Sequence, residues 1–212
     1  MDTAAETNRM CLELASALCA RLCHDLSSPL GTLSGTLDLV ADEPDNAAAA
    51  LSVAGETAVT MVARLKLLRA AWAGDCGPLN RGRIADLAAG LPPRVRVSLD
   101  GLQSEPFNGP VARVLLNLLL LGGDALPMGG TVMLAGDAQG GIVVTLEGQS
   151  VRWDAGLAAA LLDPALLPPS EPRTVQMPLT IRLAQAAGMR LSFLMAATPG
   201  PRSGPRLLLA PA

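Results

Sequence analysis

His24 and Asp25 are the two neighbouring residues of this 212-residue chain whose types most clearly permit chemistry. His24 is the only histidine in the sequence, and a carboxylate follows it directly. Near pH 7 a neutral imidazole is available as a nucleophile or as a proton carrier. The carboxylate of Asp25 is placed to accept the proton of one ring nitrogen and so fix the tautomer, as the acid of a catalytic triad does. The pair is therefore the candidate reactive centre.

The residues around His24 predict that its ring points outward from a helix. Apolar residues recur there at spacings of three and four and form the expected packing seam: Leu12, Ala15, Cys19, Leu22 and Leu26. At about 100° per residue, His24 lies on the side of the helix opposite Leu22 and Leu26. Apart from one arginine, its own face carries small residues: Ala17, Ala20, Arg21, Ser28, Gly31 and Gly35. We expect another protein to approach this face closely; tight packing against a second helix is the alternative.

Composition excludes several classes of function. The net charge is −3 and no basic cluster occurs, which argues against nucleic acid as the main partner. With two Phe, two Trp and no Tyr, base stacking on aromatic side chains is not expected. The acidic first residues lack the basic and apolar regions of a signal peptide, and the longest strongly apolar run, 114–121, is too short to span a bilayer. We expect a cytoplasmic protein without a membrane-spanning segment.

The four cysteines predict reduced thiols rather than a disulfide framework, because three of them lie in one expected helix. Cys19 and Cys23 have the i, i+4 spacing of a possible metal pair. However, Cys19 belongs to the packing seam and the chain offers no second histidine. Packing is the favoured interpretation, and we expect neither a metal site nor a bound cofactor.

Two long helices are predicted for the N-terminal part, residues 1–75. The first runs to about Asp42 and should bend at Pro29, because a proline removes one helical hydrogen bond and clashes with the preceding turn. A tight connection follows, in which Asp45 is expected to cap the second helix. That helix keeps a strict three-four alternation of apolar residues: Leu51, Ala54, Ala58, Met61, Leu65, Leu68 and Trp72. The two helices should form an antiparallel hairpin.

A single hairpin buries only one side of each helix. Its apolar stripes are covered most simply when two copies form a four-helix bundle, so we predict a homodimer. The alternative is that the hairpin packs on the rest of its own chain.

The composition break at 73–78 predicts a second domain, residues 78–212. Period-two strands and apolar helices follow one another there, which indicates an α+β sandwich with one sheet covered by helices on one face. The expected helices are 80–91, 109–121, 154–162 and 174–187, and the expected strands are 94–100, 131–137, 141–148, 189–197 and 206–210.

The segment from His24 to Leu30 resembles the H-box of sensor histidine kinases, with a histidine, an acidic residue, and a proline five positions after the histidine. The second domain resembles their Bergerat-type ATP-binding domain in element order, and the residues around Asn117 resemble the start of its N-box. Leu121 stands where an N-box has a second polar ligand, and the glycine-rich phosphate loops are missing. A degenerate nucleotide domain behind an H-box hairpin is similar to the ChpT-type histidine phosphotransferases.

This resemblance implies a dimeric phosphorelay intermediate. His24 would accept a phosphoryl group from the receiver domain of a hybrid kinase and pass it to the receivers of response regulators. Asp25 would orient the ring and stabilise the phosphoimidazole, and magnesium would come from the receiver, so no ATP is expected. Arg21 is a candidate for phosphate or partner binding, with a helix-surface ion pair to Asp25 as the alternative. Ser28 is a candidate for positioning water, with a bond back to the helix near Pro29 favoured.

Two other functions remain open at this level. The chain could be an adaptor that binds receivers without taking phosphate, or a divergent ATP-dependent histidine autokinase. Loss of signalling on His24→Ala separates the relay from the adaptor, and nucleotide binding with magnesium identifies the autokinase.

Overall fold

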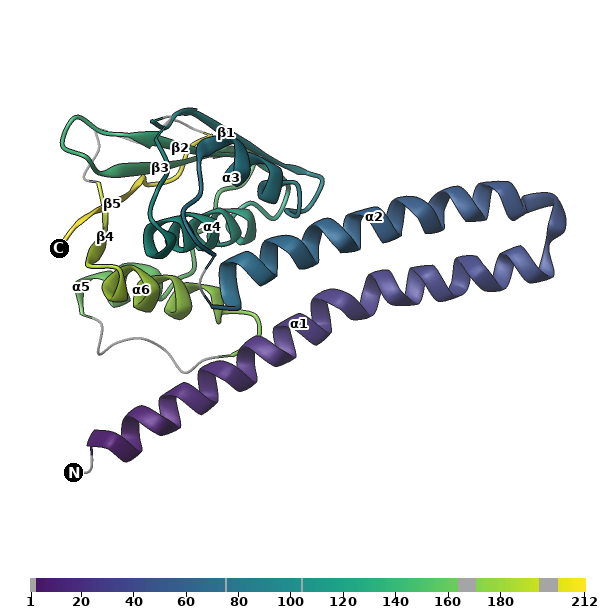
Figure 1. Ribbon diagram of the computed structural model, residues 1–212, viewed down its shortest axis with the longest axis horizontal. Coiled ribbons are helices and arrows are strands. Elements are labelled where there is room, and N and C mark those ends of the chain that lie inside the picture. The colour runs from purple at the N-terminus through teal and green to yellow at the C-terminus, as the bar shows by residue number, and fades with distance from the viewer. Residues whose placement is uncertain (1–2, 75, 104, 164–170, 195–201) are drawn as a thin grey trace.

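The computed structural model describes residues 3–74, 76–103, 105–163, 171–194 and 202–212. It has the two expected parts, a long helical hairpin and an α/β domain that lies against the hairpin near its open end (Figure 1). The predicted division into hairpin and sandwich is therefore confirmed as a fold class.

The hairpin consists of α1 (Thr3–Asp42) and α2 (Ala47–Trp72), joined by a 3-10 turn, η1 (Pro44–Asn46). Pro29 lies inside α1, which continues through it without interruption. Figure 1 shows that the N-terminal part of α1 runs in a different direction from the part paired with α2, as a proline within a helix favours. The expected Asp45 cap is wrong, because Asn46 occupies the N-cap position and makes no side-chain cap bond.

The first two helices of the second domain begin within one residue of the expected starts, and the last two begin two to three residues later than expected. Asn80 caps α3 (Arg81–Ala88) by accepting a hydrogen bond from the Arg83 amide, and Asn108 caps α4 (Gly109–Asp124) in the same way. The helix α3 is shorter than expected and α4 extends one turn further than expected. Two shorter helices follow, α5 (Leu157–Leu162) and α6 (Gln176–Ala186).

Five strands form one mixed sheet in the order β1-β2-β3-β5-β4. They are β1 (Val95–Gly101), β2 (Gly130–Gly136), β3 (Ile142–Gly148), β4 (Met189–Phe193) and β5 (Leu207–Pro211). The β1/β2 pair is parallel and the others are antiparallel. The expected strand 189–197 ends at residue 193, and its positions 195–197 lie outside the described residues.

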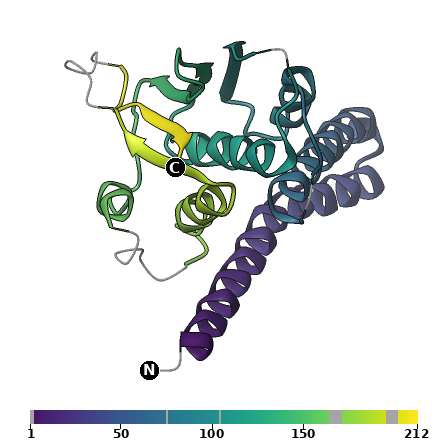
Figure 2. The ribbon, with the colours of Figure 1, turned by 60° about the vertical axis from the view of Figure 1, so that its left-hand side comes forward.

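The core of the second domain lies between the sheet and α4, with α6 packed beside α4 (Figure 2). Nearly every residue of α4 is buried, because the sheet covers one side of it and α2 and α6 contact the other. The end of α2 joins this core through Leu67, Leu68 and Ala71. Thus α2 belongs to the hairpin at one end and to the core of the second domain at the other.

Beyond this junction the hairpin exposes many apolar side chains. The large ones are Leu12, Leu30, Leu37, Leu39, Leu51, Val53, Val59, Val62 and Leu65. By length and composition the segment Pro44–Trp72 is the one helical stretch of the described residues that could cross a bilayer. Only 11% of its most apolar window is buried, whereas its last turns pack into the core of the second domain.

Candidate functional site

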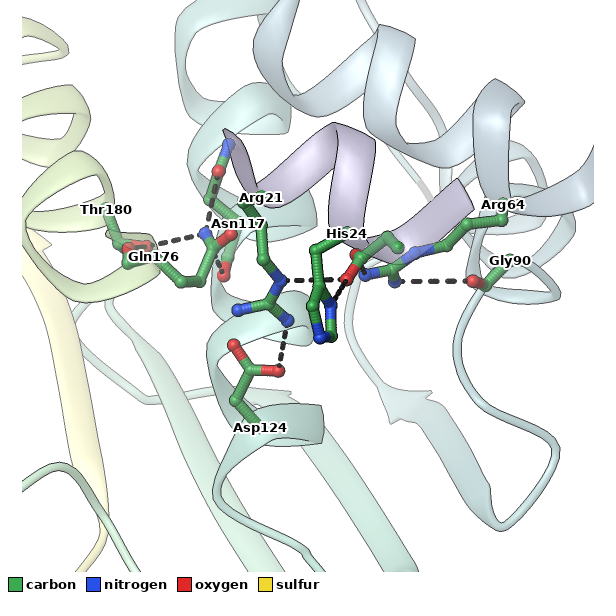
Figure 3. Close-up of polar contacts among 9 residues, drawn as sticks. Arg21, His24, Arg64, Gly90, Asn117, Asp124, Gln176 and Thr180 are labelled. Carbon is green, nitrogen blue, oxygen red and sulfur yellow. Dashed lines mark hydrogen bonds and ion pairs between the residues drawn. The ribbon is translucent and has the colours of Figure 1, made fainter. Parts of the chain in front are cut away.

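His24 lies on α1 where the hairpin meets the second domain. Its side chain is 77% exposed, as the helical phase predicts. The ring borders a groove of about 750 Å³ whose walls are α1, α2, the loop between α3 and β1, and the end of α4. The polar side chains that line this groove include Arg21, His24, Asp25, Arg64, Arg94 and Asp124. Residues of both parts of the chain therefore surround the histidine (Figure 3).

The Asp25 carboxylate lies beside the ring but is engaged by two arginines. Its Oδ1 is 3.6 Å from His24 Nδ1, which is beyond hydrogen-bond distance, so the bond expected from the sequence is not formed in this state. Arg21 Nε donates to Asp25 Oδ1 at 3.0 Å, and Arg64 Nη2 donates to Oδ2 at 2.6 Å. The carboxylate is only 13% exposed. Asp25 thus places a negative charge near His24 and is itself held by Arg21 of α1 and Arg64 of α2.

Arg21 connects the hairpin to the second domain. Its Nη2 donates to Oδ1 of Asp124, at the end of α4, over 2.9 Å (Figure 3). The ion pair with Asp25 that the sequence left as an alternative is present, but Arg21 is only 16% exposed and bridges two acids. Burial alone would lower the pKa of Arg21, yet the charges and hydrogen bonds of Asp124 and Asp25 raise it above its ordinary value. Arg21 therefore stays charged.

The same contacts hold Asp25 in its ionised form. Burial by itself raises the pKa of the Asp25 carboxyl, because it penalises the charged form. The hydrogen bond from Arg64 and the charges of Arg21 and Arg64 outweigh this, so the pKa lies below its ordinary value. The residue next to His24 is thus a fixed negative charge at neutral pH.

The small residues expected around His24 leave its face open. Ala20, Ser28 and Gly31 are exposed, and no atom lies within 4 Å of the position of a Cβ at Gly31 or Gly35. Ala17, which the sequence places on the same face, is buried instead, so the face is open only from Ala20 onward. Ser28 borders the groove, whereas the hydrogen bond back to the helix before Pro29 comes from Ser27, whose Oγ donates to the Cys23 carbonyl at 2.7 Å.

Sequence reasoning missed Arg64 and Asp124. Arg64 is 39 positions from Asp25, and Asp124 is 103 positions from Arg21. No local spacing connects residues so far apart, and a charged residue on an amphipathic helix normally faces solvent. Arg64 is one of three basic residues in the C-terminal half of α2, with Lys66 and Arg69, so its polarity did not distinguish it in the sequence.

Asn117, the residue at the N-box position, is fully buried. Its Nδ2 donates to the carbonyls of Ala71 and Arg113, and its Oδ1 accepts from Gln176 Nε2 at 2.9 Å. Every polar atom of this amide is therefore used inside the protein. One turn later, Leu121 is buried as well.

The comparisons with known proteins bear on the whole chain. Residues 81–199 match the family model of the histidine phosphotransferase C-terminal domain. A curated relative, protein phosphotransferase ChpT of Brucella abortus, is 30% identical over 200 residues, covering 86% of this chain and 90% of the relative. The chain belongs to the ChpT-type histidine phosphotransferase family. As a member of this family, the chain is a phosphorelay protein. This result agrees with the resemblance seen in the H-box and in the degenerate second domain.

A solved structure of a bacterial phosphotransferase supports the same placement for the fold. It aligns with a TM-score of 0.76 at 26% identity and covers 93% of this ChpT-type chain and 96% of its own. Residues 79–212 form less than two thirds of the chain. An alignment over 93% of the chain must therefore include the hairpin as well. The arrangement of hairpin and sandwich is thus shared with another phosphotransferase.

Proposed function

We propose that this ChpT-type protein carries a phosphoryl group on His24 between receiver domains. The group would come from the aspartyl phosphate of a hybrid kinase receiver and go to the receiver aspartates of response regulators. The observation that supports this most strongly is the position of His24. It is the only imidazole in the chain, it is exposed, and it borders a groove beside two fixed guanidinium groups.

The transfer requires one nucleophile and little other chemistry from this chain. The neutral ring attacks phosphorus through Nε2, because Nδ1 faces Asp25. The N–P bond forms as the P–O bond to the receiver aspartate breaks, and the bonding electrons leave with that carboxylate. The proton on Nδ1 stays in place, and the nearby charge of Asp25 stabilises the resulting cationic ring. The second transfer reverses these steps on another receiver.

The receiver would supply the metal ion for this chemistry. Among the described residues, no three His, Cys, Asp or Glu side chains come together so that they could hold a metal. A receiver domain with an acidic magnesium pocket complements the groove, where Arg21, Arg64 and Arg94 all contribute positive charge. Ala20, Gly31 and Ser28 would allow its close approach to α1.

We further propose that the chain works as a cytoplasmic homodimer that does not bind ATP. The exposed leucines and valines of the hairpin are too numerous for a free surface and fit a four-helix bundle. ATP binding is disfavoured because Asn117 and Leu121, at the two N-box positions, are buried and offer no side chain to a magnesium nucleotide.

The test is phosphoryl transfer from a receiver domain labelled with radioactive phosphate. The wild-type protein should take up label that is stable in alkali and labile in acid, as phosphohistidine is. His24→Ala should take up none while its circular dichroism and oligomeric state remain those of the wild type. Incubation with labelled ATP and magnesium instead of the receiver should leave the wild type unlabelled.

Each alternative predicts a different result. A protein that binds the receiver but stays unlabelled is an adaptor, and the proposal is then wrong. Labelling by ATP alone identifies an autokinase. Label that persists in His24→Ala places the phosphoryl group on another residue and also contradicts the proposal.

A further inference from the structure

A chain of polar contacts runs from the second domain through the hairpin to the residue beside His24. Asp124 holds Arg21, Arg21 and Arg64 hold Asp25, and Arg64 Nη1 donates to the Gly90 carbonyl at 3.5 Å. We call these five residues the junction network (Figure 3). Its two outer members, Asp124 and Gly90, belong to the second domain, and the three inner members belong to the hairpin.

We propose that the second domain positions the charged groups beside His24 and that Asp124 is the positioning residue through which it does so. This inference rests on the proposed phosphoryl transfer at His24. It gives the nucleotide-like domain a role in the transfer step itself, because both arginines next to His24 depend on that domain for a second partner.

The geometry carries the proposal because each arginine is fixed at two points. A free arginine side chain has many rotamers, and ordering it has an entropic cost. Arg21 is pinned by Asp25 on its own helix and by Asp124 on α4, and Arg64 by Asp25 and by the Gly90 carbonyl. Their side chains are 16% and 17% exposed. The entropic cost of ordering these two side chains therefore arises when the protein folds, before a phosphoryl group binds.

The arginines keep donors for that group. A guanidinium carries five N–H donors in a planar fork, and Arg21 directs only Nε and Nη2 at carboxylates of the described residues. The remaining donors are available to phosphoryl oxygens, which prefer arginine in a fixed orientation. The four charges of Arg21, Arg64, Asp25 and Asp124 balance, so the network offers a phosphoryl group directed N–H donors rather than net positive charge.

Close packing holds the second anchor in place. A Cβ at Gly90 would collide with the carbonyl of Ala63 on α2 and lie 2.7 Å from the Leu67 Cβ. The loop at Gly90 therefore lies directly on α2, one residue away from Arg64. This contact fixes the loop relative to the hairpin, and Asp124 on α4 fixes the other side of the groove.

The experiment compares Asp124→Asn with Asp86→Asn in the full-length protein. Both remove one negative charge from the second domain, but Asp86 is an exposed residue of α3 paired with Arg83, away from the groove. Transfer from a labelled receiver is followed in single turnover over a range of receiver concentrations. Asp124→Asn should lower the rate at saturation about tenfold and leave the half-saturating concentration unchanged, because misplacement of a positioned group slows the step without loss of binding. Asp86→Asn should transfer as the wild type does.

Two further variants test whether Asp124 acts through Arg21. Asp124→Glu restores the carboxylate and should recover most of the rate. The double variant Asp124→Asn with Arg21→Ala should be no slower than Arg21→Ala alone, because the two residues act on the same path.

The inference fails if Asp124→Asn transfers at the wild-type rate, if only its half-saturating concentration changes, or if its effect adds in full to that of Arg21→Ala. The second result would make Asp124 a receiver contact. An unlabelled wild type would refute the proposed function itself, which is a separate outcome.

Discussion

At the scale of single residues, the site is a reactive group beside a constrained charge. His24 is exposed and free to meet a partner, whereas Asp25, the next residue, is fixed by two arginines. Consecutive residues of a helix point about 100° apart, so one can face the partner while the other faces the junction. The acid can therefore stabilise charge on the ring without being free to compete for the incoming phosphorus.

Asp25 should make the stability of the protein depend on pH. Its pKa in the folded protein lies below its value in the unfolded chain, which is about 3.9. Its contribution is therefore fully present above about pH 5 and is lost as the pH falls through the folded pKa. Asp25→Asn should lower the free energy of unfolding at pH 7 by about 1–3 kcal/mol, as loss of a partly buried charged hydrogen-bond partner does.

The measurement is urea unfolding of both proteins between pH 7 and pH 3. The difference in the free energy of unfolding between the wild type and Asp25→Asn should become smaller as the pH falls below about 4. Asp86→Asn removes an exposed charge, so its free energy of unfolding should differ from that of the wild type by less than about 0.5 kcal/mol over the whole pH range. Curves for Asp25→Asn and the wild type that stay parallel over the whole range would contradict the argument.

At the scale of elements, the end of α2 is the point that joins the two parts. Arg113 and Asn117 of α4 donate to the carbonyls of Ala71 and Trp72, which have no partner within α2 because the helix ends there. Gln176 of α6 then bonds to the Asn117 side chain. A residue at the N-box position thus serves as a structural link among three helices.

Replacing Asn117 should therefore cost stability. Asn117→Ala removes one of the hydrogen-bond donors to the Ala71 carbonyl. It also removes the Asn117 Oδ1 acceptor of Gln176 Nε2, and both losses occur in a buried region. We expect the free energy of unfolding to fall by about 2–4 kcal/mol, measured by urea denaturation. Gln149→Ala, an exposed loop change, should shift it by less than about 0.5 kcal/mol. An unchanged stability in Asn117→Ala would show that the amide is not a structural link.

At the scale of the whole molecule, the hairpin extends away from the second domain and exposes an apolar surface over much of its length (Figure 1). The second domain covers only the part of the hairpin near its open end, including the site. The rest is left for another molecule, and the heptad pattern of α2 makes a second copy of the hairpin the expected one.

The dimer should depend on leucines near the closed end of the hairpin. Changing Leu37 and Leu51 together to Glu removes two large apolar contacts and places charges in the interface. Since burial of one leucine contributes about 1.5–3 kcal/mol, we expect dimer association to weaken at least about a hundredfold. Light scattering after gel filtration should show a monomer for the double variant. Leu162→Glu alters a leucine of α5 that is 88% exposed and should leave the dimer intact.

The sequence by itself determined the elements and indicated the candidate reactive group. Periodicity placed both hairpin helices and the alternating strands, and the helical phase of the residues around His24 predicted that its ring points outward. These are local properties, since each depends on residues within a few positions of one another. The H-box and the losses at the N-box also lie in short stretches and led to the right family.

Only the tertiary structure decided what surrounds His24. Arg21 is held by Asp124 of α4, Asp25 by Arg64 of α2, and Arg64 by the Gly90 carbonyl in the loop after α3. These contacts follow from how the two helices of the hairpin and the second domain pack together. A charged residue on a helix surface looks the same in sequence whether it faces water or an opposite charge from a distant element. Contacts across the junction are therefore set by packing, and for this reason Arg64 and Asp124 could not be found from the sequence.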